Sequence, residues 1–260
     1  MDLFRMKVKL TLWVLFLVFG VQAQNDTVFN GLNVSALCRN FVAWQTYQDT
    51  QIALYTNFEA MDEKGESITR LAFMQKLETG TFVCIANPEQ PQQYRLFPLP
   101  QDANPGVGAI LSELGFNGIR HVQLEGTDFP ALDAVDLTGK QISNASLKGK
   151  YVVIKCWYIH CPVCVKEFPE VNALATTYTA MRNDVVFLSL AEDSPEDLKV
   201  FLTKKKLDYL VIPKMKDFMN LTLGLNAFPT HFLLDKEGKI IKVVSTVDAL
   251  EWVLKTYLHS

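Results

Sequence analysis

The stretch Tyr151-Val-Val-Ile-Lys-Cys156, followed by Cys161-Pro162-Val163-Cys164, decides the fold of this 260-residue chain. The first run is apolar and rich in β-branched residues, as buried strands are, and a helical pattern begins at Val165. Two thiols on the first turn of a helix can close a disulfide and reopen it, which is the chemistry of electron exchange between proteins. Structural zinc sites share this spacing but usually need a second pair of cysteines, which the sequence lacks. The context therefore favours a redox pair.

Composition limits the classes of protein that this chain can belong to. It is 49% hydrophobic and 20% charged, which is typical of a globular chain with room for two domains. The net charge is −3, and no basic stripe of the kind that nucleic-acid binding needs is evident. We therefore expect no nucleic-acid partner.

The first 23 residues have the pattern of an export signal. Three basic residues precede an apolar run at residues 10–20, and Val21-Gln22-Ala23 is like a cleavage site of the A-x-A kind. The apolar run is short for a membrane span, so an uncleaved anchor is the alternative reading. We expect the protein to be exported, with a periplasm as its compartment, and residues 1–23 to be removed.

Residues 24–120 predict a small α+β domain of unknown role. Aromatic and β-branched runs at residues 41–47 and 51–58 favour strands, as do residues 81–85 and 94–97. Apolar residues at helical spacing predict a helix over 68–77 that ends at Gly80, and a short helix is expected at 109–114.

Residues 121–260 have a more regular pattern. Strands are expected at 151–156, 185–190, 210–212 and 231–234, with a hairpin partner at 239–244. Helices are expected at 162–181, from Ser194 onward, and at 247–258. This alternation predicts an α/β domain with a mixed central sheet flanked by helices.

From about Gly126 to the C-terminus the chain resembles the thioredoxin superfamily, in its exported TlpA/ResA-like branch. The resemblance rests on Phe129-Pro130, Leu137-Thr-Gly-Lys140, Leu147-Lys-Gly-Lys150, Cys156-Trp157, Cys161-Pro-Val-Cys164, Glu167-Phe-Pro169 and Phe228-Pro-Thr-His-Phe-Leu-Leu-Asp235 with Gly238. It implies a thioredoxin-like fold and thiol–disulfide exchange with cysteine-bearing exported proteins, without a cofactor or metal. The branch usually acts as a reductant that a membrane thiol donor recharges.

The helix start assigns different roles to the two cysteines. Cys161 is expected at the N-cap and Pro162 at the first helical position, where its missing N–H costs nothing. Free backbone N–H groups there favour a thiolate on Cys161, which we expect to be the nucleophile. Cys164 is then the resolving thiol that releases the mixed disulfide.

Three further residues are expected near this pair. Glu167 lies one turn beyond Cys164 and could exchange a proton with it, and the family pattern places an acid at this position; a solvated glutamate is the alternative. Pro229 resembles the cis-proline that faces the active site throughout the superfamily, with Phe228 available to pair with and contact a substrate strand. Pro169 should kink the helix.

Four residues are expected to tune the pair: Pro162 and Val163 between the cysteines, His160 and Lys155. A protonated His160 would make the disulfide more oxidising, whereas an exposed His160 would do little. Lys155 stands where cytoplasmic thioredoxins carry a buried aspartate. A buried, charged Lys155 would favour the thiolate forms of the two cysteines. Alternatively, the Lys155 side chain points into solvent.

The remaining cysteines permit two interpretations. In an oxidising compartment Cys38 and Cys84 could form a structural disulfide. Alternatively both are small buried apolar residues, as Cys156 is expected to be.

Three other functions have to be compared with disulfide reduction. A peroxidase reading fails because Ile154 and Tyr158 stand where peroxiredoxins need a proline and a threonine or serine. A Cu(I) chaperone using Cys161, Cys164 and His160 or His231 stays open, as does a disulfide oxidase or isomerase. The leading expectation is an exported protein-disulfide reductase of unknown oligomeric state.

Overall fold

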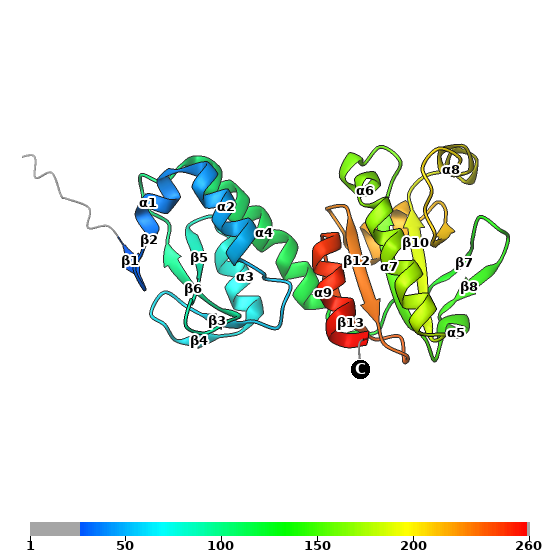
Figure 1. Ribbon diagram of the computed structural model, residues 1–260, viewed down its shortest axis with the longest axis horizontal. Coiled ribbons are helices and arrows are strands. Elements are labelled where there is room, and N and C mark those ends of the chain that lie inside the picture. The colour runs from blue at the N-terminus through cyan, green and yellow to red at the C-terminus, as the bar shows by residue number, and fades with distance from the viewer. Residues whose placement is uncertain (1–26, 259–260) are drawn as a thin grey trace, which may run out of the picture.

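A computed structural model describes residues 27–258 and shows two main sheets, of five and four strands, and two small two-stranded ones (Figure 1). The five-stranded sheet has an apolar cluster on each face, and the four-stranded sheet has a cluster of its own. The expected export signal, residues 1–23, lies outside the described residues. Within those described, no helix combines the length and the apolar character needed to cross a membrane.

The C-terminal sheet has five strands in the order β11-β10-β9-β12-β13. Strands β9, β10 and β11 run parallel, whereas β12 is antiparallel to both β9 and β13, so the predicted mixed sheet is confirmed. A separate hairpin lies beside it. The strands are β7 (Asp133–Val135), β8 (Gln141–Ser143), β9 (Tyr151–Trp157), β10 (Val185–Ala191), β11 (Leu210–Ile212), β12 (Thr230–Leu234) and β13 (Ile240–Val244).

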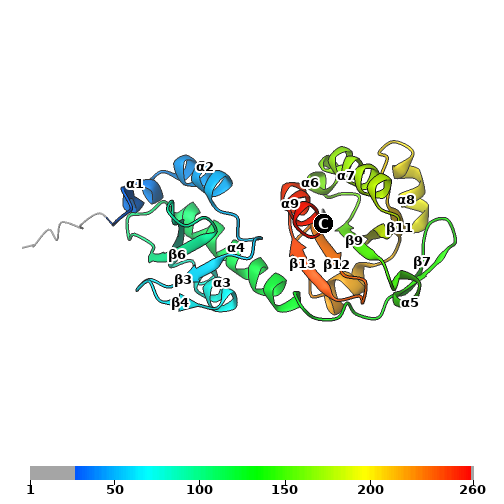
Figure 2. The same ribbon diagram turned by 60° about the horizontal axis from the view of Figure 1, so that its bottom comes forward.

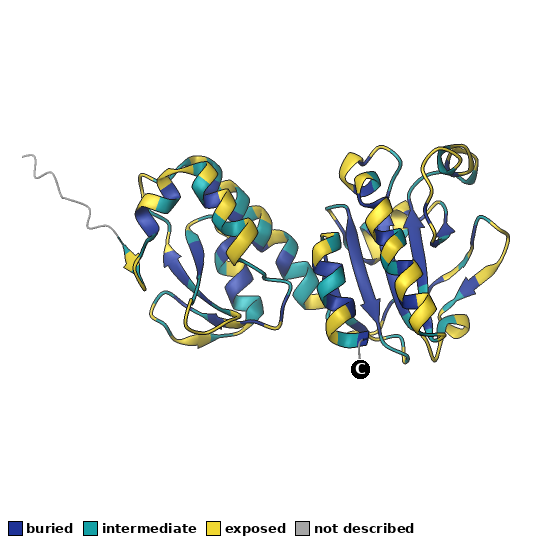
Figure 3. Cartoon of the chain, viewed as in Figure 1, coloured by how far each residue is buried: buried dark blue, intermediate teal, exposed yellow. Residues whose placement is uncertain are grey.

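Helices cover this sheet on one face, and irregular segments cover much of the other. The first face packs on α7, α8 and α9, and the second on the β7–β8 hairpin and the π-helical turn η1. The strands are therefore buried on both faces along most of their length (Figure 3). The elements are α5 (Asn144–Leu147), α6 (Pro162–Lys166), α7 (Phe168–Met181), α8 (Pro195–Leu202), η1 (Phe218–Thr222) and α9 (Val247–Leu258).

The helix expected over residues 162–181 is interrupted. It forms two helices, α6 and α7, with Glu167 between them. Pro169, in the first turn of α7, has no N–H to donate to the preceding turn, and its ring would clash with a continuing helix. The predicted kink is thus a break, and it turns the Glu167 side chain toward the sheet.

The N-terminal domain packs three helices and the first part of a fourth on a four-stranded sheet of order β4-β3-β6-β5. Its elements are β1 (Val28–Phe29), β2 (Leu32–Asn33), α1 (Val34–Arg39), α2 (Phe41–Gln51), β3 (Glu59–Met61), β4 (Ser67–Ile68), α3 (Arg70–Glu78), β5 (Phe82–Ala86), β6 (Gln93–Pro98) and α4 (Pro105–Leu124). The two strands expected at 41–47 and 51–58 are wrong. Residues 41–51 form α2, which begins where the Asn40 side chain accepts the Ala43 N–H at 3.1 Å.

Helix α4 joins the two domains (Figure 2). The short helix expected at 109–114 is in fact 20 residues long, starting after the Asn104 cap. Val107 and Leu111 lie in the N-terminal core, whereas Leu124 lies in the C-terminal one. The boundary predicted at residue 120 therefore falls inside a helix that both domains share.

Polar contacts reinforce this junction. Glu125, at the end of α4, pairs with Arg70 of α3 at 2.8 Å and with the buried Lys242 of β13 at 3.1 Å. Arg120 donates to the Leu223 carbonyl at 2.7 Å. These contacts tie the N-terminal domain to the sheet edge and to the segment that leads into β12.

Cys38 and Cys84 are free, so the possible structural disulfide is not formed. Both are fully buried in the N-terminal core. Burial raises the pKa of each thiol to about 12, which disfavours the thiolate that disulfide formation requires. Like Cys156, they act as small apolar core residues.

Helices α3 and α4 pack closely enough to require glycine at residue 115. A Cβ added to Gly115 would lie 2.2 Å from the Glu78 backbone nitrogen. We expect Gly115→Ala to lower the free energy of unfolding of the N-terminal domain by about 1–3 kcal/mol, because backbone must shift. Denaturant unfolding measures this, with the exposed Glu113→Ala as control; equal stabilities of the two variants would contradict it.

Candidate active site

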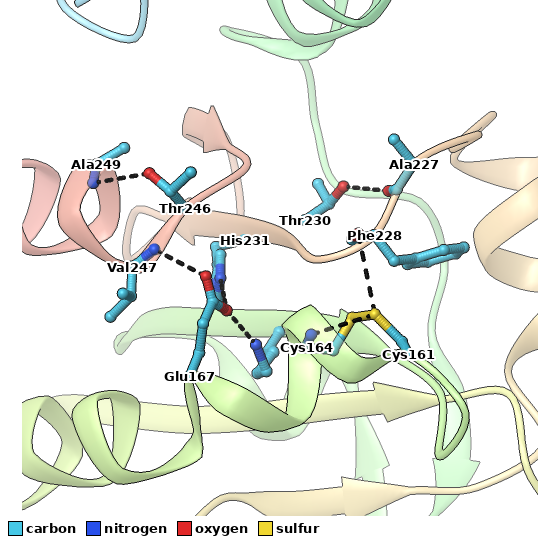
Figure 4. A network of polar contacts seen from close by, with 11 residues as sticks. Cys161, Cys164, Glu167, Ala227, Phe228, Thr230, His231, Thr246, Val247 and Ala249 are labelled. Atoms are coloured by element: carbon cyan, nitrogen blue, oxygen red, sulfur yellow. Dashed lines mark hydrogen bonds and ion pairs between the residues drawn. A yellow bond between two sulfur atoms is a disulfide. The ribbon is translucent and has the colours of Figure 1, made fainter. Parts of the chain in front are cut away.

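The redox-type pair forms a disulfide at the start of α6 (Figure 4). Cys161 is the N-cap of this helix, and its Sγ accepts the Cys164 backbone N–H at 3.2 Å. Pro162 follows in the first turn, as the sequence predicted. Cys161 is 5% exposed and Cys164 is fully buried. Cys161 is therefore the sulfur nearer to solvent.

The segment before β12 faces this disulfide. The Phe228–Pro229 peptide bond is cis, as predicted from the resemblance. The Phe228 carbonyl oxygen lies 4.0 Å from Cys161 Sγ. The half-buried Phe228 ring packs edge-on against Tyr158, with 5.7 Å between the ring centres. A backbone acceptor and an aromatic ring thus lie beside the reactive sulfur.

Glu167 binds three donors from three different elements. Its Oε2 accepts from Lys155 Nζ at 2.6 Å and lies 3.1 Å from His231 Nε2. Its Oε1 accepts the Val247 N–H, at the start of α9, at 3.0 Å. The carboxylate is buried, and Figure 4 shows it directed toward His231 and Val247. Glu167 is therefore not a solvated glutamate.

Strand pairing explains why Lys155 and His231 meet at this carboxylate. They are direct partners across the antiparallel β9–β12 ladder. Because side chains alternate along a strand, Lys155 shares a face with Val153 and Trp157, which pack toward α7 and α9. Both side chains are fully buried. The alternative that Lys155 points into solvent is thus wrong.

The charges of this network balance within the interior. Burial alone would raise the pKa of Glu167, but His231 and Lys155 together outweigh it and lower that pKa. Burial, aided by the charge of Lys155, lowers the pKa of His231 to about 4, so His231 is neutral at pH 7. Burial also lowers the Lys155 pKa, against the pull of Glu167. One cation and one anion remain, with a neutral donor beside them.

This geometry bears on the proton-transfer role expected of Glu167. Glu167 is buried, and its two cationic or polar neighbours shift its pKa downward. An ionised carboxylate can accept a proton from Cys164, yet its oxygens already accept three hydrogen bonds. In this disulfide form the network holds Glu167 as an anion, and its role in proton transfer stays a prediction.

The other predicted residues lie at the rim. Pro162, Val163 and His160 are exposed, Val163 by 60% of its surface. An exposed His160 is the less consequential of the two alternatives, although its tuning role stays a prediction. Among residues 27–258, no group of three His, Cys, Asp or Glu side chains is placed to hold a metal ion.

Sequence reasoning missed two supports of the site. His231 appeared only as a possible copper ligand, whereas it binds Glu167. Asp193, directly after a turn that ends β10, accepts the Ile159 N–H at 2.8 Å and so holds the loop before Cys161. A histidine inside an otherwise apolar strand could have indicated that His231 has a buried polar partner. The sequence around Asp193 contains no comparable indication.

A double-mutant cycle tests the buried pair. We expect Lys155→Met to lower the free energy of unfolding by about 3–5 kcal/mol, because it leaves a buried carboxylate short of its cation. Glu167→Gln should destabilise for the converse reason, and the double variant should lose less than the sum. Urea unfolding measures all three, with the exposed Lys199→Met as control. Strict additivity would show that the pair is not coupled.

The pH dependence of stability reports on His231. Below pH 6.5 the unfolded chain protonates this histidine while the folded chain, with a pKa of about 4, does not. Stability is therefore fully present above pH 6.5 and falls as the pH drops toward 4. Between pH 7 and 5, His231→Gln should show a shallower decline, by on the order of 1 kcal/mol per pH unit. His121, whose pKa burial also lowers to about 4, supplies the remaining slope.

Known proteins similar to this chain share one family and one kind of activity in their names. The Redoxin family model matches residues 124–251. Thiol-disulfide oxidoreductase ResA of Bacillus thuringiensis (strain Al Hakam) is 32% identical over 153 residues, which are 57% of this chain and 87% of that protein. Thiol:disulfide interchange protein DsbE of Pseudomonas aeruginosa is 31% identical over 133 residues, 50% of this chain and 71% of that protein.

Among solved structures, a thiol:disulfide interchange protein from Bacteroides sp. is 27% identical, with a TM-score of 0.46, covering 52% of this chain and 91% of its own. The matched part in the family model begins at the end of α4 and includes β9, the disulfide and the cis-proline segment. The extra N-terminal domain is consistent with the partial coverage. The chain therefore belongs to the redoxin family, as a ResA-like thiol–disulfide oxidoreductase.

Proposed function

We propose that this protein reduces disulfide bonds of exported proteins by cycling Cys161 and Cys164 between dithiol and disulfide. The observation that carries the proposal is the disulfide at the N-cap of α6, with its less buried sulfur beside the Phe228 carbonyl.

The cycle balances as two exchange steps. In the dithiol form the Cys161 thiolate attacks a substrate disulfide, forms a mixed disulfide and expels one substrate thiolate. The Cys164 thiolate then attacks Cys161 Sγ, which closes the Cys161–Cys164 bond and expels the second substrate thiolate. Two electrons pass to the substrate, whose thiolates take up the two protons. A dithiol donor, which we propose is membrane-bound, restores the reduced pair.

Local contacts support these separate roles. The Cys164 N–H that donates to Cys161 Sγ would stabilise a thiolate on that sulfur. Cys164, fully buried, is shielded from substrate and is suited to the intramolecular second step. The Phe228 carbonyl can accept a backbone N–H from an extended substrate, and its ring can contact an apolar neighbour of the substrate cysteine.

Location and direction of electron flow are part of the proposal. The basic and apolar pattern of residues 1–23 supports export, and a periplasm is the compartment we propose. We propose reduction over oxidation or isomerisation because the resemblance to the TlpA/ResA-like branch implies a reductant. A Cu(I)-binding role has less support, since His231 is fully buried and its Nε2 lies against Glu167.

The reduction potential of the Cys161–Cys164 pair tests the direction. We expect a value near or below about −270 mV, in the range of thioredoxin, by dithiothreitol or glutathione equilibration with alkylation and intact mass. A value of about −120 to −180 mV would indicate an oxidase or isomerase instead. Cys164→Ser should accumulate a mixed disulfide on Cys161, whereas Cys161→Ser should not. If the two cysteines do not form a disulfide reversibly, the proposed oxidoreductase function is wrong.

A further inference from the structure

A groove runs along α6 and the start of α7, the helices that follow Cys161. Its volume is about 620 Å³, and it begins at Pro162, the residue that follows the proposed nucleophile. Val165, Phe168 and Pro169 continue its apolar lining along α6 and the first turn of α7. The groove therefore extends from the residue that follows Cys161 along α6 to the first turn of α7.

Lysines line the groove beside this apolar surface. Lys166 comes from α6, and Lys204, Lys205 and Lys206 come from the loop between α8 and β11. Among the described residues, carboxylates pair with only one of these four, Lys206, whose bridge to Asp208 is 2.8 Å long and whose side chain is 81% exposed. Positive charge is thus concentrated here in a chain of net charge −3.

The lysine loop is held in place by α7. The Asn172 side chain, which also lines the groove, donates to the Lys206 carbonyl at 3.0 Å and accepts the Asp208 N–H at 2.8 Å. Leu207 and Tyr209 are buried in the core on the helical face of the sheet. The three lysines therefore extend from an anchored backbone, which reduces the ordering cost of binding a charged partner.

We propose that this groove binds an acidic segment of the partner protein, next to the cysteine that exchanges with Cys161. The inference rests on the proposed function and adds a substrate class to it: cysteines flanked on one side by aspartate or glutamate with interspersed apolar residues. The lysines of the groove would attract acidic side chains of the partner. The apolar lining at Pro162, Val165 and Phe168 would contact the apolar side chains that a polypeptide also carries.

Position favours a polypeptide over an anionic membrane surface. The groove includes Pro162, the residue after Cys161, so a polypeptide segment bound there could place a neighbouring cysteine near Cys161. A cleft lined by charges of one sign attracts partners of the opposite charge and raises their association rates by about 10 to 1,000-fold. This attraction weakens as the salt concentration rises. The proposed preference should therefore be strongest at low ionic strength.

Exchange rates with designed peptides test the groove. Three peptides of equal length carry one disulfide each and differ only in flanking glutamate, glutamine or lysine; acid quench, alkylation and mass spectrometry follow the exchange. The protein is first reduced to its dithiol form with dithiothreitol and desalted, so that the Cys161 thiolate can attack the peptide disulfide. We expect the reduced wild-type protein to react with the glutamate peptide about tenfold faster than with the glutamine peptide at low salt. In K204Q/K205Q/K206Q this ratio should fall toward one.

A matched control separates the groove from net charge. K140Q/K148Q/K150Q removes the same charge from exposed lysines near the β7–β8 hairpin and α5, away from α6 (Figure 1). It should keep the wild-type ratio within about twofold. Equal losses in the two triple variants, or no glutamate preference in the wild type, would overturn the proposal.

Two further measurements distinguish the proposed peptide binding from failure of the redox function and from binding to a membrane. If the wild-type disulfide does not exchange even with dithiothreitol, the proposed function itself fails, independently of the groove. Vesicles of phosphatidylglycerol and phosphatidylcholine test the other occupant. Cosedimentation that K204Q/K205Q/K206Q abolishes, together with an unchanged peptide ratio, would reassign the groove to a membrane surface.

Discussion

The position of the redox pair depends on one buried carboxylate. Glu167, at the break between α6 and α7, accepts hydrogen bonds from Lys155 of β9, His231 of β12 and the first N–H of α9. Removing one partner of a buried ion pair costs on the order of several kcal/mol, so the three elements are held in one arrangement. Because Glu167 lies three residues beyond Cys164, the same contacts fix the helix turn that carries both cysteines. The structural constraint and the proposed chemistry thus share a residue.

The network also explains how a lysine can occupy the central strand of a redox domain. A lone buried lysine would be neutralised by desolvation, and burial does lower the Lys155 pKa. The Glu167 carboxylate opposes that loss at 2.6 Å, and the neutral His231 adds a donor without adding charge. The interior therefore carries a balanced pair beside the disulfide, which differs from the single buried acid of cytoplasmic thioredoxins. The proton-transfer role expected of Glu167 would act through this pair, and it stays a prediction.

Regular runs could be predicted from the sequence, and positions set by distant contacts could not. Strand β9 and the CxxC turn were evident because one apolar run and one helix start carry strong local signals. The α6–α7 break was indicated by Pro169. By contrast, the apolar run around Lys155 indicated a buried strand, but nothing local showed that Glu167 and His231 would meet the lysine there, so its burial was undecided. In the N-terminal domain, the aromatic residues around Trp44 favoured a strand, whereas the Asn40 cap starts a helix whose buried residue is Trp44. Cap residues would have been the better guide there.

The two flanks of Cys161 are anchored to different parts of the chain, which gives the extra domain a mechanical connection to the site. On one flank, Phe228 belongs to a segment that begins near Leu223, whose carbonyl accepts from Arg120 of the shared helix α4. A Cβ at Gly224 would meet that guanidinium at 2.9 Å, so Arg120 lies directly against the backbone. On the other flank, Asn172 anchors the lysine loop to α7. Replacing Arg120 would therefore remove the contact on the Phe228 flank and leave the lysine loop attached to α7, which makes the two contributions separable within one molecule.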